Sequence, residues 1–237
     1  MQYNFEQPTV IVFDVNETLL NMRTVKKKVN ALLACKQGFR IWFGLLLQYS
    51  LVDTVTRSYH DFSLVAGATL HMAAHSFGTT VSDEEEKAIL NAMKELAPYE
   101  EVEDGLARLV QAGYRLVAFT NSPTATLQYQ LQATGLAKYF EAAISVDEFR
   151  HYKPDNEVYG KAMAKVNVPP QQAMMVAAHG WDIAGALKAG MQAAFIQRKG
   201  QSLYPLAPAP QLIVKNIKAL ASQLIGAKKG EVVESEE

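Results

Sequence analysis

Side chains able to act as nucleophile, acid or base fall in four short segments of the sequence. The segments are Asp14-Val-Asn-Glu-Thr18, Thr120-Asn-Ser122, Lys153-Pro-Asp155 and Ala177-Ala-His-Gly-Trp-Asp182. A carboxylate can serve as a covalent nucleophile, and a lysine within about 4–6 Å lowers the pKa of a carboxylate and keeps it ionised. Taken singly, an Asp after a strand is often a turn residue, and a Lys-Pro pair is often a solvated loop. The interpretation therefore depends on the order and spacing of the four segments.

We expect each segment to lie at the end of a strand. The first strand is the short, β-branched run Thr9–Phe13, which is typical of a strand buried on both faces. Farther along, predicted strands alternate with predicted helices; the strands are 115–120, 142–146, 174–177 and 193–196, and the helices are 101–112, 124–135, 156–165 and 182–189. Repeated strand–helix units predict a parallel, doubly wound sheet with right-handed crossovers. Since parallel strands present their carboxyl ends at one edge, the four segments should converge there.

Residues 21–97 interrupt this alternation. They contain no β-rich run, and Ser82-Asp-Glu-Glu85 is a capping box that predicts the start of a helix. An all-helical insertion after the first strand should lie over the carboxyl ends of the sheet, where ligands bind in such folds. The predicted fold is therefore α/β: a Rossmann-like core of residues 1–20 and 98–225, a helical cap of residues 21–97, and a charged tail of residues 226–237 that we expect to be disordered.

Composition excludes several classes of function. The 23 basic and 24 acidic residues give a net charge of −1, which offers no basic surface for nucleic acid or an anionic membrane. The apolar stretch Ile41–Val52 is too short to span a bilayer. Residues 1–8 do not resemble a secretory signal, so we expect a cytoplasmic protein. Cys35 stands alone, and His71 and His75 lack a third ligand nearby, so we predict no metal site and no cofactor.

The four segments, in this order, resemble the motifs of the haloacid dehalogenase superfamily over about residues 9–225. The resemblance implies that Asp14 attacks the substrate, that Thr120 binds it, and that Lys153 keeps Asp14 ionised. Most members of this superfamily are magnesium-dependent phosphatases with two further acidic residues, whose positions are Asn16 and Ala178 here. The carboxylates that remain are few for a cation that prefers six oxygen ligands.

Other features resemble the 2-haloacid dehalogenase branch, which needs no metal. They include Lys153 with Tyr159 six residues later, and Trp181 beside Asp182. The resemblance implies that Thr120 and the backbone N–H groups of Val15 and Asn16 hold the substrate carboxylate. The side chains it implies at the halide are Asn121, Phe43 and Phe62. The full set predicted to bind substrate is Val15, Asn16, Thr18, Trp42, Phe43, Tyr49, Phe62, Thr120, Asn121, Tyr159 and Trp181.

Three positions depart from that branch. An arginine of its cap, assigned to halide abstraction, aligns with Phe43; a glycine aligns with Glu17; and an asparagine aligns with His179. Glu17 and His179 together form a carboxylate–imidazole pair, a common activator of water. The predicted catalytic residues are Asp14, Glu17, Lys153, His179 and Asp182.

The predicted reaction is hydrolysis of short (S)-2-haloacids to (R)-2-hydroxy acids and halide through an ester of Asp14. The family resemblance suggests a homodimer. Two alternatives remain open: a magnesium-dependent small-molecule phosphatase, and a binding protein that has kept the fold without catalysis.

Overall fold

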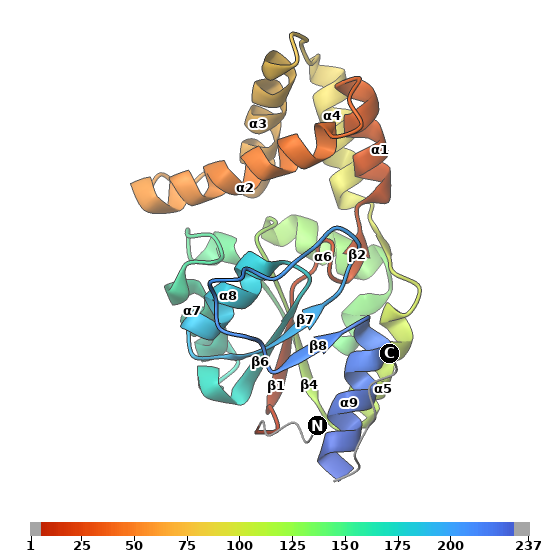
Figure 1. The fold of residues 1–237 in the computed structure, drawn as a ribbon, viewed down its shortest axis with the longest axis vertical. Helices are drawn as coiled ribbons and strands as arrows, with labels where there is room; N and C mark the ends of the chain where they lie inside the picture. Colours follow the sequence, from red (N-terminus) through yellow and green to blue (C-terminus); the bar gives the residue numbers. More distant parts are fainter. Residues whose placement is uncertain (1–5, 230–237) are drawn as a thin grey trace.

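The computed structural model describes residues 6–229, and its core is a six-stranded sheet whose neighbouring strands are all parallel (Figure 1). The strand order is β5-β4-β1-β6-β7-β8. The strands are β1 Val10–Phe13, β4 Arg115–Thr120, β5 Ala142–Ser145, β6 Ala173–Ala177, β7 Gln192–Ile196 and β8 Leu212–Val214. The predicted α/β, doubly wound fold is confirmed. The sixth strand, β8, was not predicted; it is three residues long and follows a proline-rich loop.

The central strand β1 positions the first motif. All four of its side chains are fully buried, because helices cover both faces of the sheet and leave no solvated side. β1 pairs with β4 on one edge and with β6 on the other. The crossovers therefore diverge at the carboxyl end of β1, which is where open α/β sheets bind ligands. Asp14 follows directly at that end.

Five helices pack beside the strands: α5 Val102–Gln111, α6 Thr124–Ala133, α7 Asn156–Lys165, α8 Gly180–Lys188 and α9 Ile217–Lys229. α7 and α8 lie to one side of the sheet, and α5 and α9 to the other (Figure 1). A Cβ added at Gly105 would lie 2.7 Å from Ile217 Cγ2, so the glycine lets α5 and α9 approach closely. Leu220 and Leu224 of α9 are fully buried.

The predicted start of a disordered tail at residue 226 is wrong, because residues 226–229 continue α9. Burial of one face of that helix explains why it extends so far. Residues 230–237 of the predicted tail lie outside the described residues.

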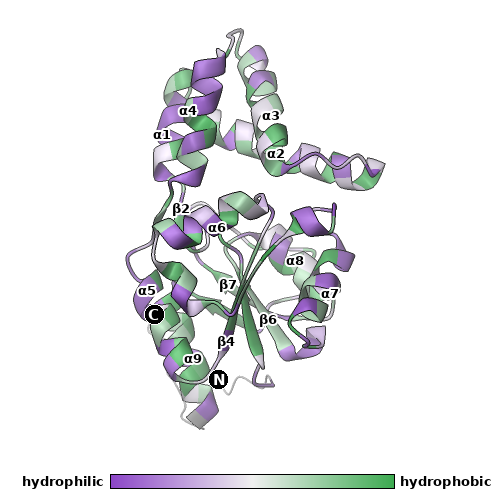
Figure 2. Ribbon diagram, turned by 180° about the vertical axis from the view of Figure 1, so that it is seen from behind, coloured by the Kyte–Doolittle hydropathy of each residue, from purple (hydrophilic) through white to green (hydrophobic). Residues whose placement is uncertain are grey.

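Four helices form the cap: α1 Arg23–Leu32, α2 Gly38–Thr56, α3 Phe62–Ser76 and α4 Asp83–Lys94. These helices lie above the carboxyl ends of the strands (Figure 1). The strands themselves are the most hydrophobic part of the core (Figure 2). The capping box is present, since Ser82 Oγ accepts the Glu85 N–H and the Glu85 carboxylate accepts the Ser82 N–H. Within residues 6–229, no helix has the length and apolar character needed to cross a membrane.

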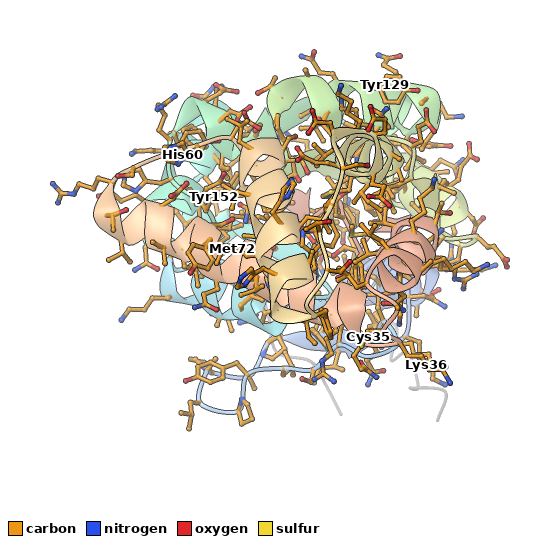
Figure 3. The ribbon with its side chains drawn as sticks, turned by 90° about the horizontal axis from the view of Figure 1, so that it is seen from above. Cys35, Lys36, His60, Met72, Tyr129 and Tyr152 are labelled. Carbon is orange, nitrogen blue, oxygen red and sulfur yellow. The ribbon has the colours of Figure 1, made fainter. Side chains whose placement is uncertain are left out.

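The cap contacts the core at both of its ends. At one end, the two linkers pair as short antiparallel strands, β2 Leu20–Asn21 and β3 Ala97–Pro98, which the sequence did not predict. At the other end, the loop after α2 rests on the core, where Tyr59 donates a hydrogen bond to Asp147 and the Arg150 guanidinium lies 4.8 Å from the Tyr59 ring centroid. Seen from above, the His60 loop lies beside Tyr152 of the core, whose hydroxyl donates to the His60 carbonyl (Figure 3). Contacts at both ends hold the cap over the sheet.

Candidate active site

Asp14 directly follows β1 at the carboxyl end of the sheet and is 4% exposed. Its Oδ1 accepts a hydrogen bond from Lys153 Nζ at 3.0 Å. Its Oδ2 accepts one from the Thr18 hydroxyl at 2.7 Å and lies 3.2 Å from His179 Nδ1. The Asp14 N–H is bound to the Val176 carbonyl of β6. The carboxylate is therefore fixed by three side chains from three separate motifs, as the convergence of the strand ends predicted.

Lys153 has no exposed side-chain surface and uses all three of its N–H groups within the protein. Besides Asp14, its Nζ donates to Asp182 Oδ2 at 2.7 Å and to the Phe119 carbonyl at 3.1 Å. Tyr159 donates to the other oxygen of Asp182 at 2.7 Å. Lys153 therefore has no donor left for a substrate, and its role is to hold two carboxylates in place. Tyr159, predicted to bind substrate, instead positions Asp182.

Electrostatics keep Asp14 in its charged form. Burial alone would raise the pKa of Asp14, but the charge of Lys153 and the contact with His179 hold that pKa well below its usual range. Burial likewise opposes the charge on Lys153, yet the two adjacent carboxylates raise the pKa of Lys153 above its ordinary value. The pKa of Asp182 is raised, first by burial and then by the neighbouring charge of Asp14, against the pull of Lys153. Asp182 is fully buried with both oxygens hydrogen-bonded to Lys153 and Tyr159, whereas Asp14 keeps some exposed surface.

His179 is the N-cap residue of α8 and faces a carboxylate at each ring nitrogen. Its Nε2 lies 3.1 Å from Glu17 Oε2, so the predicted Glu17–His179 pair is in contact. The contact of Nδ1 with Asp14 was not predicted. Burial by itself would lower the pKa of His179, but hydrogen bonds to Asp14 and Glu17 raise that pKa to about 10. In this state His179 is an imidazolium, not the neutral base that a water activator needs.

Glu17 occupies a backbone position that favours glycine. Its φ is 60°, in the left-handed region, where a residue with a Cβ is less stable by about 1–2 kcal/mol. The turn is closed by the bond from the Glu17 N–H to the Leu20 carbonyl at 2.7 Å. A strained non-glycine residue at a strand end is a reason to look for a function of its side chain. Here that side chain reaches His179.

A group of donors suited to an anion surrounds the end of β1. Within the described residues, the backbone N–H groups of Val15 and Asn16 donate to no protein atom, although both residues are buried. Thr120 lies nearby in the second motif, and its Oγ1 accepts the Ser122 N–H at 3.1 Å, which leaves its own hydrogen free to donate. Unpaired buried N–H groups are costly unless a ligand or water satisfies them. This arrangement fits the predicted carboxylate site.

Several predicted binding side chains are engaged elsewhere. The Asn121 amide clamps the backbone of Lys153, accepting its N–H at 3.0 Å and donating to its carbonyl at 3.3 Å. Trp42 is fully buried inside the cap, where its indole N–H donates to the Ala66 carbonyl at 2.9 Å. Thr18, besides binding Asp14, accepts the Ala178 N–H. The polar atoms of these three side chains are therefore bound to other protein atoms.

The aromatic residues fall into two groups. Phe43 of α2 and Trp181 of α8 both stack on His179, with ring centroids 6.3 Å and 5.1 Å away. Trp181 also lines a pocket of about 450 Å³ with Tyr204 and Lys188. Phe62 instead packs on Tyr152 at 5.9 Å, and Tyr49 is half-buried on α2. Among the described residues, no hydrogen bond or ion pair joins Phe62 or Tyr49 to Asp14.

Three supporting residues were missed by sequence reasoning. Gln201, in the loop after β7, donates to Glu17 Oε2 at 3.1 Å. Gln130 of α6 donates both to the Asn16 side chain and to the Met93 carbonyl of the cap. Arg198 binds the Thr18 carbonyl at 2.8 Å. Each is a polar residue in an ordinary loop or helix, and no spacing in the sequence marks it.

A metal site in a protein needs several ligating side chains close together. Among residues 6–229, no group of three or more His, Cys, Asp or Glu side chains is placed to hold a metal ion. The positions where the phosphatases of the superfamily carry acidic residues are Asn16, whose amide donates to Ser122 at 2.9 Å, and Ala178.

The fold and the buried aspartate–lysine pair at the carboxyl end of the sheet define an α/β hydrolase with a helical cap. In agreement, residues 8–190 match the haloacid dehalogenase-like hydrolase family, and the chain belongs to that family. Within it, the chain falls in the 2-haloacid dehalogenase branch. It is 32% identical over 189 residues to (S)-2-haloacid dehalogenase 1 of Pseudomonas sp. (strain CBS-3), covering 79% of this chain and 83% of the relative.

Other relatives are consistent with this branch. The chain is 28% identical over 191 residues to (S)-2-haloacid dehalogenase 4A of Burkholderia cepacia, covering 80% of this chain and 83% of the relative. The structure of the L-2-haloacid dehalogenase of Xanthobacter autotrophicus with chloropropionic acid covalently bound superposes with a TM-score of 0.84 at 22% identity, covering 92% of this chain and 99% of that one. At that identity the superposition shows the shared fold.

Proposed function

We propose that this protein hydrolyses short (S)-2-haloacids to (R)-2-hydroxy acids through an ester of Asp14. The observation that carries the proposal is the buried carboxylate of Asp14, held ionised by Lys153 at 3.0 Å beneath a helical cap. A nucleophile must be unprotonated, and this environment keeps Asp14 so throughout the neutral range. The names of the relatives support the choice of substrate, and the covalently bound chloropropionic acid in the Xanthobacter enzyme supports the intermediate.

In the first step, the substrate carboxylate binds to Thr120 and to the N–H groups of Val15 and Asn16. This places C2 of the haloacid against Asp14. The carboxylate of Asp14 attacks C2 opposite the halogen, the C–X bond breaks, and halide leaves with the bonding electrons. In-line displacement inverts C2, so an (S)-haloacid yields an (R)-hydroxy acid.

In the second step, water attacks the carbonyl carbon of the Asp14 ester, and the 2-hydroxy acid is released. Water is a poor nucleophile until it loses a proton, and a positioned base contributes about 10²–10⁴-fold. We assign that base to His179, which must first lose one ring proton and which is oriented by Glu17 at 3.1 Å. Gln201 in turn fixes the Glu17 carboxylate.

The leaving group departs without the arginine found in the branch that this chain resembles. Phe43 stands in its place, and the removal of one preorganised donor costs about 3–4 kcal/mol in other enzymes. We therefore propose an apolar halide site that favours large, weakly hydrated halides. Activity should fall in the order iodo, bromo, chloro, with fluoro near zero. Efficient release of fluoride would contradict this assignment.

The alternative is a magnesium-dependent phosphatase. The phosphatases of the superfamily carry an acid where this chain has Asn16, and its amide is bound on both sides, to Ser122 and Gln130. The position of the other acid is Ala178, whose N–H binds Thr18. We therefore rank this alternative second.

The test is halide release from chloro-, bromo- and iodoacetate and from both enantiomers of 2-bromopropionate, with excess chelator present. We expect turnover of the (S)-enantiomer, unaffected by the chelator, and an (R)-lactate product. Strict dependence on added magnesium, with turnover of an aryl phosphate, would return the phosphatase to first place. If Asp14→Asn leaves turnover unchanged, the nucleophile is wrong.

A further inference from the structure

The contacts of His179 fix its protonation state in the resting protein. Its Nδ1 lies 3.2 Å from Asp14 Oδ2, and its Nε2 lies 3.1 Å from Glu17 Oε2. An ionised carboxylate only accepts hydrogen bonds, so both ring nitrogens must donate, and a histidine with two N–H groups is an imidazolium. An imidazolium cannot take a proton from water. The base that ester hydrolysis requires is therefore absent until one nitrogen loses its proton.

We propose that the charge of Asp14 switches His179 between two states: an imidazolium while Asp14 is a free carboxylate, and a neutral base once Asp14 is an ester. The inference rests on the proposed function, because that function supplies the ester. An ester carries no net charge and accepts hydrogen bonds weakly, so alkylation removes one of the two anions that keep the ring protonated. Glu17 retains its bond to Nε2–H. The nitrogen that deprotonates is then Nδ1, which faces the ester.

The steps balance in protons and electrons. Asp14 forms a C–O bond to C2, and halide leaves with the electron pair of the C–X bond. Nδ1 of His179 then releases its proton to solvent. Water attacks the ester carbonyl carbon, gives one proton to Nδ1 and the other to the departing alkoxide, and the acyl C–O bond breaks. Asp14 is again a carboxylate, His179 is again an imidazolium, and one haloacid and one water have become a hydroxy acid, a halide and a proton.

The surroundings of His179 make its charge sensitive to these two carboxylates. Within the described residues, Asp14 and Glu17 are the charged side chains that form ion pairs with it. The rings stacked on it, Phe43 at 27° and Trp181 at 22°, carry no charge and favour a cation over their faces. The side chain of His179 is only 5% exposed, so water screens neither contact.

Within the described residues, no other charged side chain forms a hydrogen bond or ion pair with His179. Lys153 donates hydrogen bonds to Asp14 Oδ1, the oxygen that does not face His179, and to Asp182. Arg198 is held by the Thr18 carbonyl and by Glu101. The hydrogen bonds to Asp14 and Glu17 outweigh burial and raise the pKa of His179 to about 10, in agreement with the contacts.

The switch can be tested without substrate by comparing the protein with Asp14→Asn. Asparagine has nearly the same shape as aspartate and lacks its charge, so it reproduces the loss of charge on esterification. Proteins labelled with ¹⁵N-histidine are titrated by NMR, and the His179 signals are assigned by their loss in His179→Gln. We expect an imidazolium from about pH 6 to pH 9 in the unmodified protein, and a titration midpoint lower by about one unit or more, at least tenfold in proton affinity, in Asp14→Asn.

His71 provides an internal control. It pairs with Glu86 on the surface of the cap, and its signals should be the same in both proteins. Asp14→Asn must also unfold cooperatively, at a temperature above that of the titration. A neutral His179 at pH 7 in the unmodified protein, or an unchanged midpoint in Asp14→Asn, would overturn the switch.

A single-turnover experiment separates the switch from the proposed function. Excess enzyme is mixed with (S)-2-bromopropionate in weak buffer near pH 8, and bromide, protons and lactate are followed together. The switch requires that the proton appear with bromide, before lactate. A proton that appears only with lactate refutes the switch while the function stands. Absence of bromide refutes the function, and the NMR comparison then decides by itself whether the charge of Asp14 controls His179.

Discussion

Removal of the buried cation at Lys153 should destabilise the fold and disable the nucleophile together. Lys153→Met keeps the apolar stem but deletes the ammonium that binds Asp14 at 3.0 Å, Asp182 at 2.7 Å and the Phe119 carbonyl at 3.1 Å. Removing one partner of a buried ion pair costs about 3–5 kcal/mol. For a chain of this size, that corresponds to a fall in Tm of about 6–20 °C. Chemical denaturation and calorimetry measure the loss directly.

The same substitution should raise the pKa of Asp14, because the charge that offsets burial is gone and the charge of Asp182 remains. Halide release at neutral pH should therefore be lost, with partial recovery as the pH rises and Asp14 ionises. The control is Lys153→Met combined with Asp182→Asn, which removes the like charge and keeps an oxygen for the Tyr159 hydroxyl.

The double variant should be more stable than Lys153→Met alone, by on the order of 1–3 kcal/mol. If Lys153→Met is as stable as the unmodified protein, or if Asp182→Asn destabilises it further, repulsion between the two carboxylates is not what Lys153 relieves.

Three further predictions concern His179. His179→Ala should slow ester hydrolysis about 10²–10⁴-fold while sparing alkylation. Mass analysis after bromoacetate should then find one carboxymethyl group on Asp14, and Glu17→Gln should give a milder form. Failure to accumulate the adduct would remove His179 from the second step. The pKa of His179 is raised from 6.5 to about 10 in the folded protein, so its contribution to stability is complete below pH 6.5 and is lost as the pH rises to 10. The free energy of unfolding, relative to that of His179→Gln, should fall by about 1.4 kcal/mol per pH unit in that window. Parallel plots of unfolding free energy against pH for the two proteins would contradict an imidazolium. Finally, Phe43→Arg should place a second cation against His179 and impair activity, whereas the same change should be better tolerated in a His179→Asn background. A double-mutant cycle with a coupling energy under about 0.5 kcal/mol would show that the two positions are independent.

The sequence determined the order of the core elements and the convergence of the motifs. The apolar run Val10–Phe13 has to be a buried strand, and helices between successive strands force it and its neighbours to be parallel. Parallel strands present their carboxyl ends together, so Asp14, Thr120, Lys153 and Asp182 were bound to meet. The convergence of the motifs needs only local periodicity and one rule of topology, whereas the prediction of an aspartate nucleophile rested on the resemblance to a known superfamily.

Tertiary structure alone decided how each side chain is used. Asn121 and Trp42 have residue types that suit a binding pocket, yet their polar atoms are bound to the Lys153 backbone and to the Ala66 carbonyl. Gln201 reaches Glu17 across 184 positions of sequence. Hydrogen-bond partners at such separation depend on loop paths, which hydrophobic periodicity does not specify. A three-residue strand such as β8 is likewise too short to leave a pattern.

The charge of His179 is the property that depends most clearly on the tertiary structure. The sequence predicted the pairing with Glu17, because both residues stand at positions that line the catalytic cleft of the family that the chain resembles. It did not predict that the other ring nitrogen faces Asp14, since that depends on the side-chain rotamer at the start of α8. One carboxylate partner leaves a histidine free to act as a base, whereas two make it an imidazolium. Protonation state follows from the positions of all neighbouring charges to within about an ångström, and only the folded structure fixes those positions.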